Sequence, residues 1–372
     1  MAASPDEIAD VRGGFARMAA DHPELPLYAA ICAAVADDDE TASLLLAARP
    51  GQRRPVLWLA ALHDLVLRRP DLPAARWFAS VVGPDAVPVG DPWPDIRRTV
   101  LDHREELAHV ITTRSTQTNE VNRCVYVAAA LGRVCADLPE RPVVLVELGA
   151  SAGLLLGVDH YRVELTSDSD DVVTVLGDPA STVVCAGTDR SRRRPPVGPL
   201  PRIVGRVGLD LDPVDLRDPE AVRWLEACLW PDVAGRVERF RAAVAVTVAT
   251  SPTLRRGDMV DDLGDVIRSA VAGADSPDVH VVVLSSWALT YVAKERRPQV
   301  AVVLSDAARG GMPVSWLTAE PPGCMPGLRL PPALADRTSG TVLGARTWRA
   351  GHETEPGVLG TCHEHGQWID LA

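Results

Sequence analysis

The first third of the chain repeats apolar residues at helical spacing. This pattern predicts helices at 6–20, 27–37, 55–67, 96–112 and 120–135. Within the third of these, apolar residues dominate nearly every face, which indicates a helix at the centre of a bundle. His63 lies in that helix, and a histidine on such a face is more often a hydrogen-bonded core residue than a ligand. Because no strand pattern precedes residue 143, we expect residues 1–140 to form a helical domain.

The pattern changes at Val143, where four consecutive aliphatic residues begin a run that ends in a turn of small residues, Gly149-Ala-Ser-Ala-Gly153. Such a run is typical of a strand buried on both faces in a parallel sheet. The small residues let backbone amides approach a ligand, and residues 154–158 predict a helix whose N-terminus would favour negative charge. Glu147 is therefore expected at the strand end, beside a ligand crevice.

The remainder of the chain alternates between strand and helix patterns. Residues 161–185 predict short antiparallel strands, and together with the basic, proline-rich loop 190–202 they suggest an insertion near 159–202. That basic loop is more often solvated than a binding site for an anion. Beyond it, strands are predicted at 203–207, 254–260, 279–285, 312–320, 341–348 and 357–362, with helices at 219–229, 237–249 and 291–308. The predicted fold class is α/β: a Rossmann-like, mostly parallel sheet flanked by helices over residues 141–372, preceded by the N-terminal helical domain.

Composition narrows the classes of function. The 372 residues carry a net charge of −12, which disfavours nucleic acid and anionic membranes as partners. The start of the chain is acidic where a secretory signal would be basic, and no window approaches the roughly 18 apolar residues of a spanning helix. The seven cysteines are scattered without a Cys-x-x-Cys pair, which suggests neither a disulfide framework nor a zinc ribbon. We therefore expect a cytoplasmic protein with a small-molecule partner, and composition leaves the oligomeric state open.

Four segments resemble the motifs of class I S-adenosylmethionine-dependent methyltransferases. Glu147-Leu-Gly-Ala-Ser-Ala-Gly153 is similar to the acidic residue and glycine-rich loop that hold the methionine end of the cofactor. Gly208-Leu-Asp210 resembles the turn whose carboxylate accepts hydrogen bonds from the two ribose hydroxyls. Arg256-Gly-Asp258 resembles the loop that contacts the adenine amino group, and the strand ending at Ser285 would face the transferable methyl. The resemblance thus implies S-adenosylmethionine as cofactor, with Glu147, Gly149, Ser151, Gly153, Asp210, Asp258 and Ser285 as its site.

Two departures from that pattern carry structural expectations. Ser151 stands where the loop usually has a glycine, a change that is tolerable if its φ angle is negative. Asp210 lies 57 positions after Gly153, far beyond the spacing of a simple βαβ unit, so the segment near 159–202 must be inserted between the first two strands.

Candidate substrate contacts flank these motifs. Gln117, Asn119 and Glu120 precede the helix that leads into the first strand. They either line the crevice or cap that helix, with Thr118 or Asn119 at its N-terminus. Trp287 and Tyr291 follow the fourth strand and are candidates for the substrate pocket.

The whole string resembles one narrower group, an uncharacterised bacterial family catalogued as a domain of unknown function, DUF 2332. The shared signatures are Gln117-Thr-Asn-Glu120, Arg123-Cys124, Glu147-Leu-Gly-Ala-Ser-Ala-Gly-Leu154, Gly208-Leu-Asp-Leu-Asp-Pro-Val-Asp215, Trp224-Leu225, Trp230-Pro-Asp232 and His365-Gly-Gln-Trp368. The resemblance covers nearly the full length and implies no particular chemistry.

Other interpretations of the same residues stay open. The turn also matches Gly-x-Ser-x-Gly, the nucleophile elbow of α/β-hydrolases, with Ser151 as nucleophile, His365 as base and Asp258 as orienting acid. Against this, hydrolases place the elbow after several strands. A third hypothesis is a non-catalytic binding module. The tail residues Cys362, His363, Glu364 and His365 are metal-ligand types, and His363 and His365 would share a strand face. Without a preceding ligand pair we predict no metal site. A dinucleotide cofactor is less expected, because the local glycine and acid spacing is missing.

Overall fold

The computed structural model describes residues 5–49, 51–192, 198–276, 278–335, 340–354 and 356–372. Residues 193–197 of the basic loop predicted at 190–202 lie outside this described part. The chain forms two compact units. Unit 1 contains residues 1–119 and 217–240, and unit 2 contains residues 120–216 and 241–372. None of the described helices is long and apolar enough to cross a membrane.

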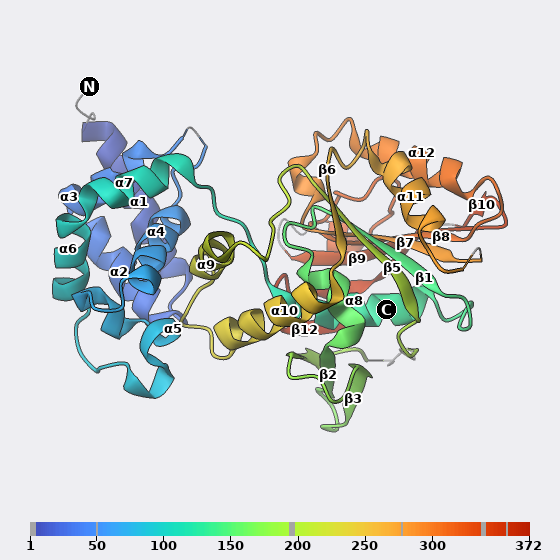
Figure 1. Ribbon diagram of the computed structural model, residues 1–372, viewed down its shortest axis with the longest axis horizontal. Coiled ribbons are helices and arrows are strands. Elements are labelled where there is room, and N and C mark those ends of the chain that lie inside the picture. The colour runs from blue at the N-terminus through green and yellow to red at the C-terminus, as the bar shows by residue number, and fades with distance from the viewer. Residues whose placement is uncertain (1–4, 50, 193–197, 277, 336–339, 355) are drawn as a thin grey trace. The chain divides into compact units, whose positions relative to one another are not determined.

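Every regular element described in unit 1 is helical (Figure 1). The elements are α1 (Pro5–Asp21), α2 (Pro26–Ala36), α3 (Asp39–Ala42), η1 (Ser43–Ala47), α4 (Pro55–Arg68), η2 (Pro73–Trp77), α5 (Ala79–Val82), η3 (Pro84–Ala86), α6 (Trp93–Asp102), α7 (Arg104–Thr113), α9 (Pro219–Ala227) and the start of α10 (Arg236–Thr250). Helix α4 is buried from Leu57 to Val66, which confirms its predicted central place. His63 in this helix is fully buried, and its ring bonds to the Ala227 carbonyl and the Ser80 hydroxyl.

The single helix predicted at 96–112 is wrong, because α6 ends at Asp102 and α7 begins at Arg104. His103 between them has φ −117° and ψ 25°, outside the helical range. No glycine or proline marks this break, and apolar periodicity on both sides hides one non-helical residue.

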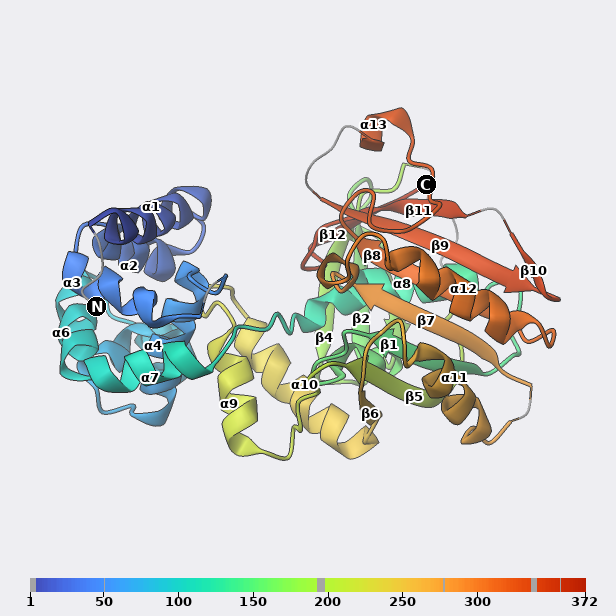
Figure 2. The same cartoon turned by 90° about the horizontal axis from the view of Figure 1, so that it is seen from above.

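Unit 2 is built on one twelve-stranded sheet. Its strands are β1 (Val143–Leu148), β2 (Arg162–Ser167), β3 (Val173–Gly177), β4 (Val184–Asp189), β5 (Ile203–Asp210), β6 (Thr253–Arg256), β7 (His280–Ser286), β8 (Val314–Glu320), β9 (Thr341–Arg349), β10 (His352–Glu353), β11 (Gly357–Cys362) and β12 (Trp368–Leu371). They lie in the order β3-β2-β4-β12-β11-β9-β8-β7-β1-β5-β6, with β10 paired to β9. Figure 2 shows the row from β5 through β1, β7 and β8 to β9.

The sequence order of these strands reverses at β1. Strands β6, β5, β1, β7 and β8 are parallel neighbours, and β9 pairs antiparallel to β8. The chain passes from β1 outward through β5 to β6, then returns to β7 on the other side of β1. In open α/β sheets, ligands bind at the carboxyl ends of the strands where such a reversal occurs. The topology therefore directs attention to the carboxyl end of β1.

Helices cover both faces of this part of the sheet. Helices α11 (Leu263–Ala272) and α12 (Arg297–Ala308) pack on one face, where Val144, Val146 and Leu148 point. Successive strand residues alternate in direction, so Glu147 points to the opposite face. On that side α8 (Cys124–Val134) contacts β2, β4, β8, β9 and β12, and η4 (Val121–Arg123) leads into it. All six residues of β1 are buried, which confirms the predicted central strand.

The segment after β1 departs from the prediction in two ways. Residues 154–160 form the 3₁₀ helix η5 (Leu154–His160) instead of an α-helix. The strands predicted as antiparallel are only partly so, because β2 pairs antiparallel with β3 but parallel with β4. Their partner at the far side is β12, which pairs parallel with β4, so the insertion extends the main sheet. Sequence alternation shows that strands form but carries no information about their direction.

Two later helices also differ from expectation. The helix predicted at 291–308 begins at Arg297, after the short 3₁₀ turn η6 (Leu289–Tyr291). Pro298 occupies its first turn, a position that suits proline because the missing N–H would have no helical partner there. Helix α11 was not predicted from the sequence, although its apolar residues face the sheet.

Candidate functional site

Glu147 lies near the carboxyl end of β1, where the topology expects a ligand. Its side chain is 4% exposed, and Oε2 has no hydrogen-bond partner among the described residues. Burial raises the pKa of this carboxyl well above its usual range, while the positive charge of Arg123 opposes the rise. A buried acid with an unused oxygen is suited to a polar partner that brings a positive charge or a donor.

The loop after β1 is tightly folded and closely packed. Gly149 and Gly153 have φ angles of +70° and +73°. A Cβ atom on Gly149 would lie 2.7 Å from the Cβ of Ala288 in the loop after β7, so a larger residue does not fit. Ser151 has φ +49°, which contradicts the expectation of a negative angle and places a non-glycine residue in the left-handed region. Backbone strain of this kind is often found at functional sites.

Arg123 supplies a positive charge at this edge of the sheet. The sequence analysis did not name it as a site residue. Its side chain is 8% exposed. Nε donates to the Glu364 carbonyl at 3.1 Å, and Nη1 donates to the Ser286 carbonyl at 3.3 Å. No carboxylate oxygen among the described residues lies within 4 Å of it, so this buried guanidinium has no ion pair. A buried charge without a counter-charge is costly, which suits Arg123 to an anionic ligand group.

Ser286 and Tyr126 complete the polar side of the edge. Ser286 ends β7, and its hydroxyl lies 2.8 Å from the Tyr126 hydroxyl on α8. The same serine hydroxyl lies 3.5 Å from Nη1 of Arg123. Strands β1 and β7 are neighbours, so their ends bring Glu147 and this serine to one edge. Neither Ser286 nor Tyr126 was a candidate from the sequence.

Glu320 ends β8 and is 1% exposed. Its Oε1 accepts hydrogen bonds from the Ala288 and Leu289 amides at 3.0 and 3.1 Å, and the Ser285 hydroxyl also favours its charged form. Burial raises its pKa to about 7 despite these amides, which favour the charged form. A carboxyl with this pKa exchanges protons readily near neutral pH.

Asn122 ties the C-terminal signature to Arg123. Its Nδ2 donates to the Ala186 and Gly366 carbonyls at 3.0 and 3.1 Å, and its Oδ1 accepts from the Ala186 amide at 2.9 Å. Gly366 has φ +75°, and a Cβ atom there would lie 2.0 Å from the Asn122 carbonyl oxygen. The signatures Arg123-Cys124 and His365-Gly-Gln-Trp368, about 240 residues apart, therefore meet at one place.

Asp210 and Asp258 lie where the methyltransferase resemblance expects them, at the ends of β5 and β6, but both carboxylates have partners in the protein. Asp210 accepts from the Ser151 amide at 2.8 Å and the Asp212 amide at 2.9 Å. Asp258 forms a two-point ion pair with Arg296 at 3.0 and 3.1 Å. Burial is the largest single influence on the pKa of its carboxyl and raises it, but Arg296 and the Val260 and Asp261 amides together hold the pKa below the usual value. Each Asp210 oxygen uses one of its lone pairs and retains another.

The three residues expected near the transferable methyl lie in different environments. Ser285 is fully buried in β7, on the face covered by α11 and α12. Trp287 has φ +56°, and its indole N–H donates to the Thr341 hydroxyl at 3.0 Å. Tyr291 is 86% exposed and forms no wall of an enclosed pocket.

The segment before α8 shows a cap. Glu120, not Thr118 or Asn119, is the N-cap of η4, which leads into α8, and its Oε1 accepts from the Asn122 amide at 2.9 Å. Asn119 is buried, and its Nδ2 has no hydrogen-bond partner among the described residues. Gln117 contacts Cys228 within unit 1 through its backbone amide, which lowers the pKa of that thiol against the larger effect of burial.

The predicted strand at 357–362 is confirmed as β11, but the histidines that follow it are not part of a strand. His363 and His365 lie in the turn between β11 and β12, with ring centroids 5.8 Å apart, so the expectation of a shared strand face is wrong. Among the described residues, no group of three or more His, Cys, Asp and Glu side chains is arranged to hold a metal. Asp258 makes no hydrogen bond to His365 in the described part of the chain, and its partners are Arg296 and the amides of Val260 and Asp261.

The sequence could have indicated part of what was missed. Arg123 lies in a family signature three residues after Glu120. Because an almost wholly apolar helix follows it, this arginine could be expected to be buried together with that helix. Ser286 and Glu320 gave no comparable signal, because each ends an apolar strand like any other polar residue.

No curated protein matches this chain. Residues 13–371, however, match the profile of a family described as an uncharacterized protein conserved in bacteria, DUF2332, and the chain belongs to that family.

Proposed function

We propose that this protein binds S-adenosylmethionine at the carboxyl edge of β1 and β5 and transfers its methyl group to a small molecule. The observation that carries the proposal is the pair of uncompensated groups at this edge. Arg123 has no ion pair among the described residues, and Glu147 has an oxygen without a partner there. An α-amino acid presents one carboxylate and one ammonium, and the methionine end of the cofactor is such a group.

The parallel neighbours β6-β5-β1-β7-β8 with antiparallel β9 support the same proposal, since a reversal of strand order at β1 is what a Rossmann-like sheet would have at its ligand site. In this arrangement Arg123 would bind the carboxylate and Glu147 the ammonium of the cofactor. Asp210, half-buried at the end of β5, would accept the ribose hydroxyls through its remaining lone pairs. The donor and acceptor types present at this edge therefore fit the cofactor.

The chain's own residues would bind, orient and hold a proton. The bound cofactor supplies an electrophilic methyl group, so alignment with the acceptor accounts for most of the catalysis. Glu320, with its pKa of about 7, is suited to receive the proton that an acceptor hydroxyl or amine loses. Ser286 and Tyr126 would orient that acceptor.

Calorimetric titration with S-adenosylmethionine and S-adenosylhomocysteine tests the proposal. We expect micromolar binding that weakens at least about tenfold in Arg123→Gln, because the carboxylate loses its charged partner. Arg133→Gln on α8, the helix that follows Arg123, serves as the matched control and should leave binding unchanged. Circular dichroism of each variant checks folding. Absence of binding at millimolar cofactor, or an equal loss in the control, would refute the proposal, and binding without any turnover would favour a non-catalytic module.

One observation favours serine hydrolysis as a second candidate. Ser151 lies in a left-handed conformation within Gly-x-Ser-x-Gly directly after a strand, as nucleophiles of that class lie on a strained turn. A fluorophosphonate probe would label Ser151 in this case, and Ser151→Ala would abolish the labelling. Peptide mapping that finds no modified Ser151 removes this candidate.

A further inference from the structure

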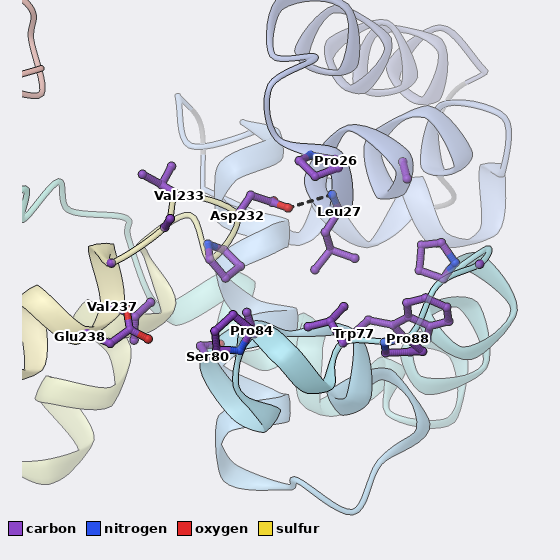
Figure 3. A pocket seen from close by; sticks show the side chains of 18 residues that line it. Pro26, Leu27, Trp77, Ser80, Pro84, Pro88, Asp232, Val233, Val237 and Glu238 are labelled. Atoms are coloured by element: carbon purple, nitrogen blue, oxygen red, sulfur yellow. Dashed lines mark hydrogen bonds between the residues drawn. The ribbon is translucent and has the colours of Figure 1, made fainter.

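Unit 1 contains a cavity that the methyltransferase proposal does not use. Its volume is about 690 Å³, within the range of small-molecule sites, and its lining residues come from 26–30, 77–92 and 231–238 (Figure 3). All of these residues belong to unit 1, so the cavity is a property of that unit alone.

The wall of the cavity is mainly apolar. Five prolines line it, at positions 26, 84, 88, 92 and 231, together with Leu27 and Trp77. Proline has no backbone N–H, so this wall offers few donors to an anion or to a strongly hydrated ligand. Figure 3 shows Trp77 beside Pro88 on one side of the cavity and Asp232 near Leu27 on another. Apolar surface with one polar group is the usual composition of a site that binds a compact organic molecule.

Asp232 is the half-buried charged group in the wall, whereas Glu238 is exposed. Its two oxygens accept hydrogen bonds from the Leu27 and Tyr28 amides at 2.8 and 3.1 Å. Among the described residues it has no ion pair, and burial raises the pKa of its carboxyl although the two amides lower it. No lysine, arginine or histidine is among the described residues that line the cavity, whereas Glu238 adds a second carboxylate.

Asp64 in the same unit is a carboxylate whose charge is balanced by ion pairs with arginines. It is buried and pairs with Arg68 at 3.0 Å and with Arg223 at 2.9 Å. Asp232 lacks such partners, and unlike Asp64 it borders an open cavity. A ligand that brings a positive charge would supply the counter-charge that the chain does not.

We propose that this cavity binds a small apolar molecule with one positive charge, held by Asp232 and by contact with Trp77 and the proline wall. Two amides already satisfy one lone pair of each Asp232 oxygen, and the remaining lone pairs are available to the cation. Trp77 adds aromatic contact area to the proline wall; because the Arg76 guanidinium already lies over its ring, 5.3 Å from the centroid, attraction for the cation comes from Asp232. Anions of the same shape would meet two carboxylates and should bind weakly.

Two ions of nearly identical shape and opposite charge, tetraphenylphosphonium and tetraphenylborate, test the proposal on the full-length protein. Equilibrium dialysis should show the phosphonium bound at least about tenfold more tightly than the borate. Asp232→Asn should weaken phosphonium binding by a similar factor and strengthen borate binding, because it removes one of the two carboxylates that repel the anion. Ala30→Trp, an exposed lining position on α2, should weaken phosphonium binding by reducing the cavity volume.

The controls separate this site from general attraction of cations to an acidic protein. Asp71→Asn removes an exposed carboxylate of unit 1 outside the lining and should change phosphonium binding less than about twofold. Equal affinity for the two ions, no phosphonium binding at about 1 mM, or an equal loss in the Asp71 variant would overturn the proposal. If Asp232→Asn does not fold, the relative affinity of the wild-type protein for the two ions still tests the proposal. None of these outcomes depends on S-adenosylmethionine.

Discussion

Arg123 in unit 2 and Asp232 in unit 1 are both partly or wholly buried charges without an ion partner in the described chain, yet their surroundings differ. Arg123 sits among polar groups at a sheet edge, where the Ser286 and Glu364 carbonyls accept its hydrogen bonds. Asp232 borders an apolar cavity and has only two amides as partners. The first site is closed and held together by segments distant in sequence, whereas the second is open. An unpaired charge can therefore lie either in a polar site assembled from distant segments or in the wall of an apolar cavity.

The largest expected effect comes from breaking the junction that holds Arg123. Gly366→Ala would place a Cβ atom 2.0 Å from the Asn122 carbonyl oxygen at φ +75°. We expect a loss of about 4 kcal/mol in the free energy of unfolding, measured by urea denaturation. Gly311→Ala has a similar φ, +85°, with no neighbouring atom within 4 Å, and should lose only about 1 kcal/mol. Similar losses in the two variants would show that the junction is loosely packed.

The next effect is a pH dependence of stability that arises from Glu320 in the closed site. The folded-state pKa of Glu320 is raised from 4.5 to about 7 by burial, so its contribution to stability is complete below pH 4.5 and lost as the pH rises through 7. Glu320→Gln mimics the neutral form and keeps an acceptor for the two amides. The variant should equal wild type near pH 4.5 and exceed it by about 3 kcal/mol above pH 8. Denaturation at several pH values measures this difference, and a constant difference between variants would contradict the assigned pKa.

A smaller effect contrasts the two carboxylates of unit 1. Asp64→Asn leaves Arg68 and Arg223 without their buried partner and should cost about 2 kcal/mol, less than a fully buried pair because both arginines are partly exposed. Asp232→Asn removes a charge that the fold does not compensate, so it should cost less than about 1 kcal/mol. Thermal unfolding of both variants at pH 7 gives the comparison. A larger loss for Asp232 would mean that it acts mainly as a cap of α2.

The smallest effect concerns Asp258, at the border of the closed site. Its ion pair with Arg296 is partly exposed on both sides. Asp258→Asn should therefore cost only about 0.5 kcal/mol, and moderate salt should remove most of that difference. If the same variant abolishes S-adenosylmethionine binding, Asp258 serves the cofactor as the sequence motif implies. Unchanged binding would assign it to the loop alone.

The helical first segment, the buried strand at Val143 and the turn of small residues after it could all be predicted from local patterns. These patterns report burial directly, since an apolar stretch must be covered and a glycine-rich turn must bend. The α-helix after that turn was wrong, because apolar residues at 154–158 are compatible with either helix type. The direction of β4 was wrong because alternation is the same in parallel and antiparallel strands.

Sequence by itself determined the mixed α/β class, the family, and the buried strand that carries Glu147 with the tight turn after it, because each depends on residues that are near one another in the chain. Tertiary structure alone decided that Arg123 has no ion partner among the described residues, that Glu320 and Ser286 share its edge, and that Asp232 borders a cavity. These properties depend on distances between segments up to 240 residues apart and on which charges lose water. No local pattern records them, since a charge becomes unpaired only when the whole fold has placed its neighbours.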